Sequence, residues 1–287
     1  MLFIVLSALS SIFVALLLKS ARARKIDTVQ LIAWNYATGL ILCGVVLKPS
    51  ITAMDNLALP WPWLTLLAVL LPSVFIIYSL SLNKAGIIRT EVAQRLSLLI
   101  ALAAAFTFLG DTLTPLKLIG IALGVGAIVL LALNGSHAKS SAKYTGLLLL
   151  GVWVGYGVVD VTLKQIAASG IPLAVALSIS FLIAGLIMFT VVLFRHHTSR
   201  STLKFGNVYL GILLGLLNFA NIVYYLKAHQ TFTAQPAIVF ASMNILVITL
   251  GILAGRFIYK EALHLRTSAA LMLCFSAIGF LTLSQWH

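Results

Sequence analysis

The sequence holds ten long apolar stretches that fall into two similar sets of five. Each is apolar over about 20 residues, the length a helix needs to cross a bilayer. A repeated unit with an odd number of spans enters the membrane from opposite sides in its two copies. We therefore predict an all-α integral membrane fold with ten transmembrane helices, arranged as two inverted five-helix repeats over residues 1–138 and 139–287. The predicted spans are Leu2–Leu18, Val29–Leu47, Pro62–Leu82, Glu91–Leu109, Pro115–Leu133, Tyr144–Leu163, Pro172–Phe194, Val208–Lys227, Gln235–Gly255 and His264–Ser284.

Composition excludes a water-soluble protein. Hydrophobic residues make up 61% of the chain and charged residues only 9%, whereas soluble domains carry about 25% charged residues. The net charge of +13 does not indicate nucleic-acid binding, because the Lys and Arg residues are spread over short loops. Cys43 and Cys274 lie inside predicted spans, no Cys/His cluster suits zinc, and no Gly-rich loop suits a nucleotide. We expect no cofactor, no metal and no nucleic-acid partner.

The distribution of positive charge predicts an orientation, because positive loops tend to stay in the cytoplasm. The odd-numbered loops and adjoining helix ends hold 14 Lys and Arg residues, and the even-numbered ones hold 4. This bias predicts that the odd-numbered loops are cytoplasmic and that both termini lie outside. The odd-loop residues are Lys19, Arg22, Arg24, Lys25, Lys84, Arg89, Lys139, Lys143, Arg195, Arg200, Lys204, Arg256, Lys260 and Arg266.

Several residues recur at the same place in the two halves. The segment FLGDTLTPLKLIG aligns with FIYKEALHLRTSA, which places Asp111 on Glu261, each in a turn before a helix. An acid there suits the positive end of the following helix dipole. The offsets are about 145 to 150 residues throughout. The other aligned pairs are Lys19 with Lys164, Tyr78 with Tyr224, and Gln94 with Asn244.

With this repeat, its length and its acid-turn-helix motifs, the chain resembles the drug/metabolite transporter superfamily in its ten-helix EamA-type branch. The motifs read LGDTLTPLKLIGIALGVGAIVLL and YKEALHLRTSAALMLCFSAIGFLTL. The resemblance implies alternating access around a central cavity lined by helices 1, 3, 4, 6, 8 and 9, with helices 5 and 10 at the periphery. Many ten-helix relatives are assigned both termini inside, against the charge distribution here.

The sixth span carries one polar stripe. Trp153, Tyr156, Asp160 and Lys164 follow one another at steps of three, four and four residues, so they share a helix face. The functional interpretation is a cavity wall in which aromatic rings stack on a ligand and Asp160 holds a proton or a cation. The structural alternative is an Asp160–Lys164 ion pair near a helix end, with the aromatic rings in the interfacial belt.

The fourth span opens with Glu91, Gln94 and Arg95. Ionisable groups inside a membrane are costly and usually functional. Arg95 offers a planar fork of donors that can grip a carboxylate or phosphate of a substrate, and Glu91 is a second candidate for proton coupling. The alternative is a Glu91–Arg95 pair, one turn apart, that only fixes the helix against its neighbours.

Further polar side chains in the spans are candidates for contacts with a substrate or with neighbouring helices. Asn218, Asn221 and Tyr225 share a face of the eighth span. The remaining candidates are Asn35 and Tyr36 in the second span, Tyr78 in the third and Asn244 in the ninth.

These features predict a secondary active transporter of small organic metabolites, such as amino acids, related amphipathic solutes or drugs. We expect a proton-coupled exporter in a bacterial inner membrane that is not an enzyme, with the bilayer and a small-molecule substrate as partners, as a monomer or homodimer. The alternatives are an importer of a cationic or zwitterionic metabolite, an integral-membrane enzyme acting on lipid head groups, and a partner subunit without transport activity. An enzyme would need an acid–base cluster near one interface, and the two membrane-depth acids lie in separate halves.

Overall fold

Every regular element in the described part of the chain is a helix. The computed structural model describes residues 1–49, 59–100, 103–104, 114–133, 139–198, 203–232 and 236–284. Two helices continue into a π-helical turn, α2 into η1 and α10 into η2. The elements are α1 (Leu2–Ala23), α2 (Thr28–Leu42), η1 (Cys43–Leu47), α3 (Trp61–Lys84), α4 (Ile87–Arg95), α6 (Pro115–Leu133), α7 (Lys139–Ala168), α8 (Leu173–His197), α9 (Phe205–Thr231), α10 (Pro236–Leu253), η2 (Ala254–Ile258) and α11 (Leu265–Leu283).

Eight of the described helices are long and apolar enough to cross a membrane. They correspond to the first three predicted spans and to the last five. Of the other two, α6 is a shorter apolar helix, and the fourth span extends beyond the described residues. The structure is consistent with an integral membrane protein, while the count of ten spans and the two inverted repeats stay predictions.

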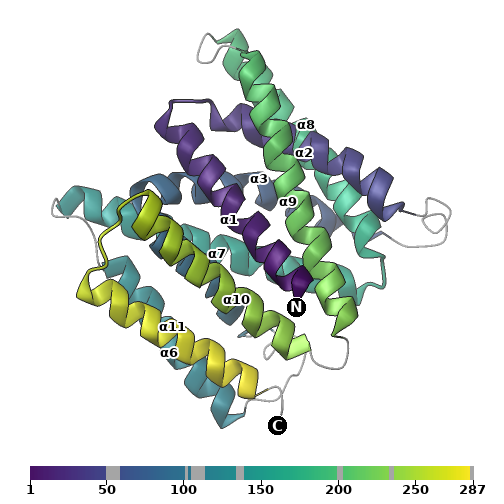
Figure 1. Cartoon of the computed structure of the whole chain (residues 1–287). Helices are drawn as coiled ribbons and strands as arrows, with labels where there is room; N and C mark the ends of the chain where they lie inside the picture. The colour runs from purple at the N-terminus through teal and green to yellow at the C-terminus, as the bar shows by residue number, and fades with distance from the viewer. Residues whose placement is uncertain are drawn as a thin grey trace.

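The helices pack in pairs that cross between the two halves of the sequence. Figure 1 shows α6 beside α11 at one edge and α2, α8 and α9 at the opposite edge, with α1, α7 and α10 between them. Helix α1 packs on α9 of the second half, and α3 packs on α7. An inverted repeat would give such reciprocal pairs, because exchanging the halves turns one contact into the other.

Glycine pairs let some of these helices approach closely, as expected for small residues four apart in membrane helices. A Cβ atom at Gly211 of α9 would lie 2.5 Å from the Cβ atom of Trp34 on α2. A Cβ atom at Gly215 would lie 2.5 Å from the Cβ atom of Thr38. Larger side chains would therefore force α9 and α2 apart. The tight seam fixes α9, which carries Asn218, Asn221 and Tyr225.

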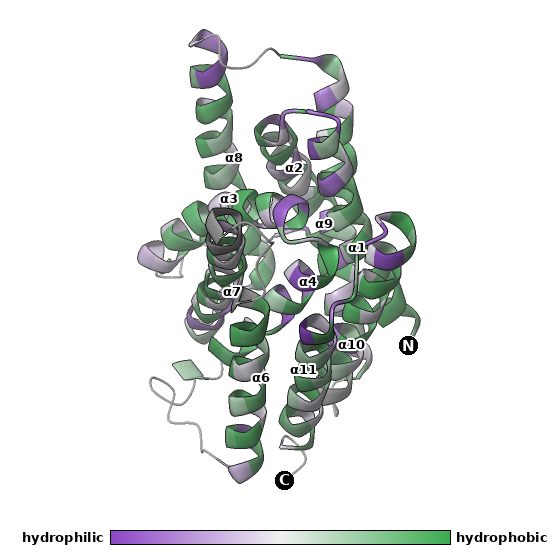
Figure 2. Cartoon of the chain, turned by 90° about the vertical axis from the view of Figure 1, so that its left-hand side faces the viewer, coloured by the Kyte–Doolittle hydropathy of each residue, from purple (hydrophilic) through white to green (hydrophobic). Residues whose placement is uncertain are grey.

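The fourth span is interrupted, which corrects the expectation of one continuous helix from Glu91 onward. Helix α4 ends at Arg95, and Leu96 and Ser97 form a turn. The backbone N–H of Ser97 bonds to the carbonyl of Gln94, three residues back, instead of continuing the α-helical pattern. Broken helices are tolerated at membrane depth where they are buried in protein or line a cavity. Figure 2 shows the purple, hydrophilic turns of α4 enclosed by mostly green helices.

Candidate functional site

A buried acid and an arginine occupy one face of α4. Glu91 is fully buried, and its Oε1 accepts a hydrogen bond from the Tyr78 hydroxyl of α3. Its Oε2 lies 3.8 Å from Nη2 of Arg95, one turn further along α4. Gly251 of α10 packs against the Glu91 side chain, since a Cβ atom there would lie 3.2 Å from the Glu91 Cγ. The predicted Glu91–Arg95 pair is therefore present and is enclosed by α3 and α10.

Arg95 faces a cavity of about 410 Å³, the polar cavity. Asp160 of α7 lies on its wall and accepts a hydrogen bond of 3.1 Å from the Ser97 hydroxyl. Lys164, which is exposed, lies one turn beyond Asp160 toward the end of α7 and marks the mouth. The cavity is lined by Gln94, Arg95, Ser97, Leu98, Tyr156, Asp160, Leu163, Lys164, Asn221, Tyr225, Phe240, Met243 and Asn244.

A second space of about 310 Å³, the apolar cavity, shares four lining residues with the first: Tyr156, Leu163, Asn221 and Tyr225. Apart from Asn218, its other walls are aromatic and aliphatic side chains of α2, α3, α7, α8 and α9, among them Tyr36 and Phe181. The resemblance had implied no part for the second and seventh helices, yet α2 and α8 line this space. The polar cavity thus adjoins the apolar cavity.

The structure brings most of the predicted site residues to these two cavities. Gln94, Arg95, Asp160 and Asn244 line the polar cavity, Tyr36 and Asn218 line the apolar one, and Tyr156, Asn221 and Tyr225 line both. The other four predicted residues, Asn35, Tyr78, Glu91 and Trp153, line neither cavity in the described part of the chain.

Three of those four residues contact residues of the cavity walls, since Glu91 pairs with Arg95 as described above, and Asn35 and Tyr78 make the contacts given below. The indole Nε1 of Trp153 donates at 2.9 Å to the carbonyl of Leu96, where α4 is broken, and the same carbonyl also accepts from the backbone N–H of Leu99. The Asn35 oxygen accepts from the Asn218 amide at 3.2 Å. Tyr78 stacks edge-on against Tyr156, with ring centroids 5.9 Å apart. In this structure these side chains support the walls.

Helix α1 contributes two serines that sequence reasoning missed. The Ser11 hydroxyl accepts a 2.9 Å hydrogen bond from Nη2 of Arg95, and Asn221 donates to the carbonyl oxygen of Ser7 at 2.8 Å. The available signal was their spacing, because Ser7 and Ser11 lie one turn apart in a largely apolar part of the helix. Nε of Arg95 and Oε1 of Gln94 are buried with no hydrogen-bond partner among the described residues. Buried polar atoms normally have partners, so a ligand here would supply them.

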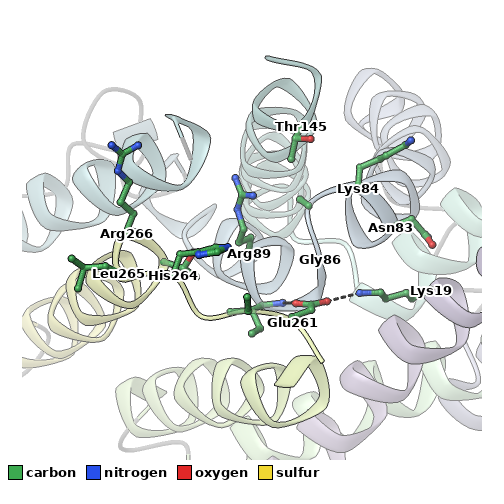
Figure 3. A pocket seen from close by; sticks show the side chains of 14 residues that line it. Lys19, Asn83, Lys84, Gly86, Arg89, Thr145, Glu261, His264, Leu265 and Arg266 are labelled. Carbon is green, nitrogen blue, oxygen red and sulfur yellow. Dashed lines mark hydrogen bonds and ion pairs between the residues drawn. The ribbon is translucent and has the colours of Figure 1, made fainter. Parts of the chain in front are cut away.

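The opposite end of the bundle is held by Glu261, which follows η2. Its carboxylate accepts from the backbone N–H groups of Ile87 (2.8 Å) and Ile88 (3.2 Å), and it forms an ion pair with Lys19 of α1. Figure 3 shows this ion pair as a dashed line. Gly86 leaves room for the carboxylate, since a Cβ atom there would lie 2.7 Å from Oε2. We call Glu261 with these three donors the latch.

Glu261 bonds to the N-terminus of a helix, as expected of an acid in this turn, but the helix is not the expected one. Glu261 was expected to favour the helix that follows it, α11. It instead bonds the first amides of α4, which lies about 170 residues earlier. A carboxylate at a helix N-terminus is stabilised by the free N–H groups and by the helix dipole. The corresponding acid of the first half, Asp111, lies outside the described residues.

Comparison with known proteins agrees with this architecture. Residues 1–133 match the EamA-like transporter family. The chain is 38% identical over 281 residues to an uncharacterized protein of Haemophilus influenzae, with 96% of this chain and 95% of that protein covered. A solved crystal structure covers 98% of this chain at 19% identity with a TM-score of 0.56, which shows a shared fold. The chain belongs to the EamA-like transporter family and is a membrane transporter of the drug/metabolite transporter superfamily.

Proposed function

We propose that this protein is a secondary active transporter of small amphipathic metabolites, such as amino acids or related solutes, working by alternating access. One observation carries the proposal: the polar cavity, with Arg95 and Asp160 on its wall, adjoins the apolar cavity. A molecule with a carboxylate, an ammonium group and an apolar part fits both. Arg95 would bind the carboxylate, because its fork matches carboxylate geometry.

Asp160 is the proposed coupling residue. Its carboxylate lines the polar cavity, where it can meet either a substrate ammonium group or a proton. A carboxylate that is exposed to one side of the membrane and then the other can carry a proton between them. Glu91 is the second candidate, although it is shut between Tyr78 and Arg95 in this conformation.

We further propose that the latch end faces the cytoplasm and that transport runs outward in a bacterial inner membrane. The support is the excess of Lys and Arg in the loops at that end. A reporter that is active only in the cytoplasm, fused after His287, should then be silent. An active reporter would show that the C-terminus is cytoplasmic, which is the orientation opposite to the one proposed.

A ligand screen tests the proposed substrate class. A ligand that binds only the folded state raises the melting temperature by mass action. Purified protein should respond to zwitterions with an apolar side chain more strongly than to the matching amines or carboxylic acids, and Arg95→Gln should lose the response. A response to sugars alone, unchanged in Arg95→Gln, would contradict the proposal.

A further inference from the structure

A second charged space lies at the latch end, away from the polar cavity. This basic cleft has a volume of about 850 Å³ and lies among the ends of α3, α4, α7 and α11. Its walls carry Lys19, Lys84, Arg89 and Arg266 against a single acid, Glu261. Transport through the central cavities does not require this excess of positive charge at the surface.

The one acid of the cleft is already engaged by the latch. Glu261 is bonded to Lys19 and to two backbone amides. Among the described residues, no ion pair joins Lys84, Arg89 or Arg266 to an acid. Figure 3 shows the guanidinium groups of Arg89 and Arg266 pointing the same way, with Lys84 across the hollow. The cleft therefore keeps at least three positive charges for an external anion.

Arg89 is held in place for such an anion. Its Nη2 donates to the backbone carbonyl of Leu131 at 2.6 Å, which fixes the guanidinium group between α4 and α6. Its Nε is buried and has no hydrogen-bond partner among the described residues. A buried donor without a partner costs free energy, and a phosphate oxygen would remove that cost. The N-terminus of α11 also borders the cleft, and His264 at its N-cap makes no side-chain capping bond.

The surroundings of the cleft are apolar and face outward. Leu265, on its rim, is 86% exposed. On α7, Tyr144 and Leu147 are exposed beside Thr145, which lines the cleft. Tyrosines are common where membrane helices meet the head groups. An occupant of this place would have an anionic head and long apolar chains.

We propose that the basic cleft binds the phosphate of an anionic phospholipid head group, with Arg89 and Arg266 as its main donors. Basic pockets between membrane helices bind lipid phosphates in this way. The lipid would join α4, α7 and α11 at the end that the latch closes. The proposal does not depend on the substrate of the central cavities.

Lipid titration of the full-length protein in neutral detergent tests the proposal. Phosphatidylglycerol binding is measured by native mass spectrometry, with phosphatidylcholine and glycerol 3-phosphate as parallel arms. Arg89→Gln and Arg266→Gln should each weaken phosphatidylglycerol binding about tenfold, since each removes a charge-assisted contact. The matched control is Arg256→Gln, an exposed arginine at the same end that does not line the cleft. It should bind like the wild type.

Three results would overturn the proposal: equal binding by all variants, equal binding of phosphatidylcholine, or Arg89-dependent binding of glycerol 3-phosphate without preference for the lipid. The last would assign the cleft to a soluble phosphorylated ligand. Arg89→Gln also removes a structural bond to Leu131. Arg266 is exposed, so Arg266→Gln keeps the test decisive if Arg89→Gln does not fold.

Discussion

The latch and the polar cavity handle buried charge in opposite ways. At the latch, both oxygens of the Glu261 carboxylate accept hydrogen bonds, from α1 and from the start of α4. At the cavity, Nε of Arg95 and Oε1 of Gln94 are buried and have no hydrogen-bond partner in the part of the chain that the structure describes. The contrast teaches that the latch fixes the first backbone amides of α4, whereas the last turn of α4 leaves polar side-chain atoms beside the polar cavity without partners. We propose that the first end holds a conformation and that the second receives the ligand.

The largest effect is expected from Asp160→Asn. Removing the only carboxylate on the wall of the polar cavity in the described residues should abolish gradient-driven transport, while ligand binding and exchange persist. Uphill uptake and counterflow in proteoliposomes measure the two activities separately. The control is Asp160→Asn/Lys164→Gln, which restores charge balance at the cavity mouth. If that double variant recovers pH-dependent uphill transport, Asp160 is only an ion-pair partner and Glu91 is the next candidate.

Arg95→Gln should have the next largest effect. A hydrogen bond to a charged group contributes about 1.5–3 kcal/mol, so ligand affinity should fall roughly 30-fold. Isothermal titration with a ligand from the thermal screen measures this. Arg195→Gln is the matched control, because Arg195 forms a part-exposed ion pair with Asp27 at 3.4 Å. Equal affinities in the two variants would move Arg95 to a structural role.

Glu261→Gln should have a smaller effect that acts at a distance. An amide loses the ion pair with Lys19 and weakens the cap on α4, so the conformation with the cavity open becomes less populated. The apparent ligand affinity should fall several-fold, because it scales with that population. Lys19→Gln should reproduce the change and Lys25→Gln, an exposed neighbour at the same end, should not. Unchanged ligand affinity in both Glu261→Gln and Lys19→Gln would show that the latch does not control the conformation of the polar cavity.

The smallest effect is expected from Phe181→Leu in the apolar cavity. Losing part of an aromatic wall should weaken binding of ligands with large apolar groups by about threefold, at roughly 25 cal/mol per Å² of lost contact. Ligands with a small side chain should be unaffected. The control is Leu186→Ala on the same helix, because Leu186 is 62% exposed and lines neither cavity. A loss that is equal for large and small ligands would indicate general loosening of α8.

The sequence predicted what depends on local periodicity. Steps of three and four residues placed Tyr156, Asp160 and Lys164 on one face of α7, and the structure has them on one cavity wall. Hydropathy located the eight described helices that are long and apolar enough to cross a membrane.

What the sequence could not predict depends on contacts between distant residues. Glu261 and Lys19 are 242 residues apart, and Arg95 and Ser11 are 84 apart. The break at Leu96 and Ser97 also has no glycine or proline to mark it. The Leu96 carbonyl at the break accepts from Leu99 and also from Trp153 of another helix. Only the packed structure shows such a contact between helices that are distant in the sequence.

Solvent access at the two ends of α4 tests the central claim most directly. Ser81→Cys places a thiol at a fully buried position near the latch end, beside Thr90. Leu163→Cys places a thiol at a partly buried position that lines both cavities. Both are made in a background in which Cys43 and Cys274 are replaced by alanine. With the latch intact, a polar thiol reagent should label residue 163 quickly and residue 81 slowly. Adding Glu261→Gln should raise labelling at 81 and lower it at 163. Changes of the same sign at both positions, or no change, would contradict alternating access controlled by the latch.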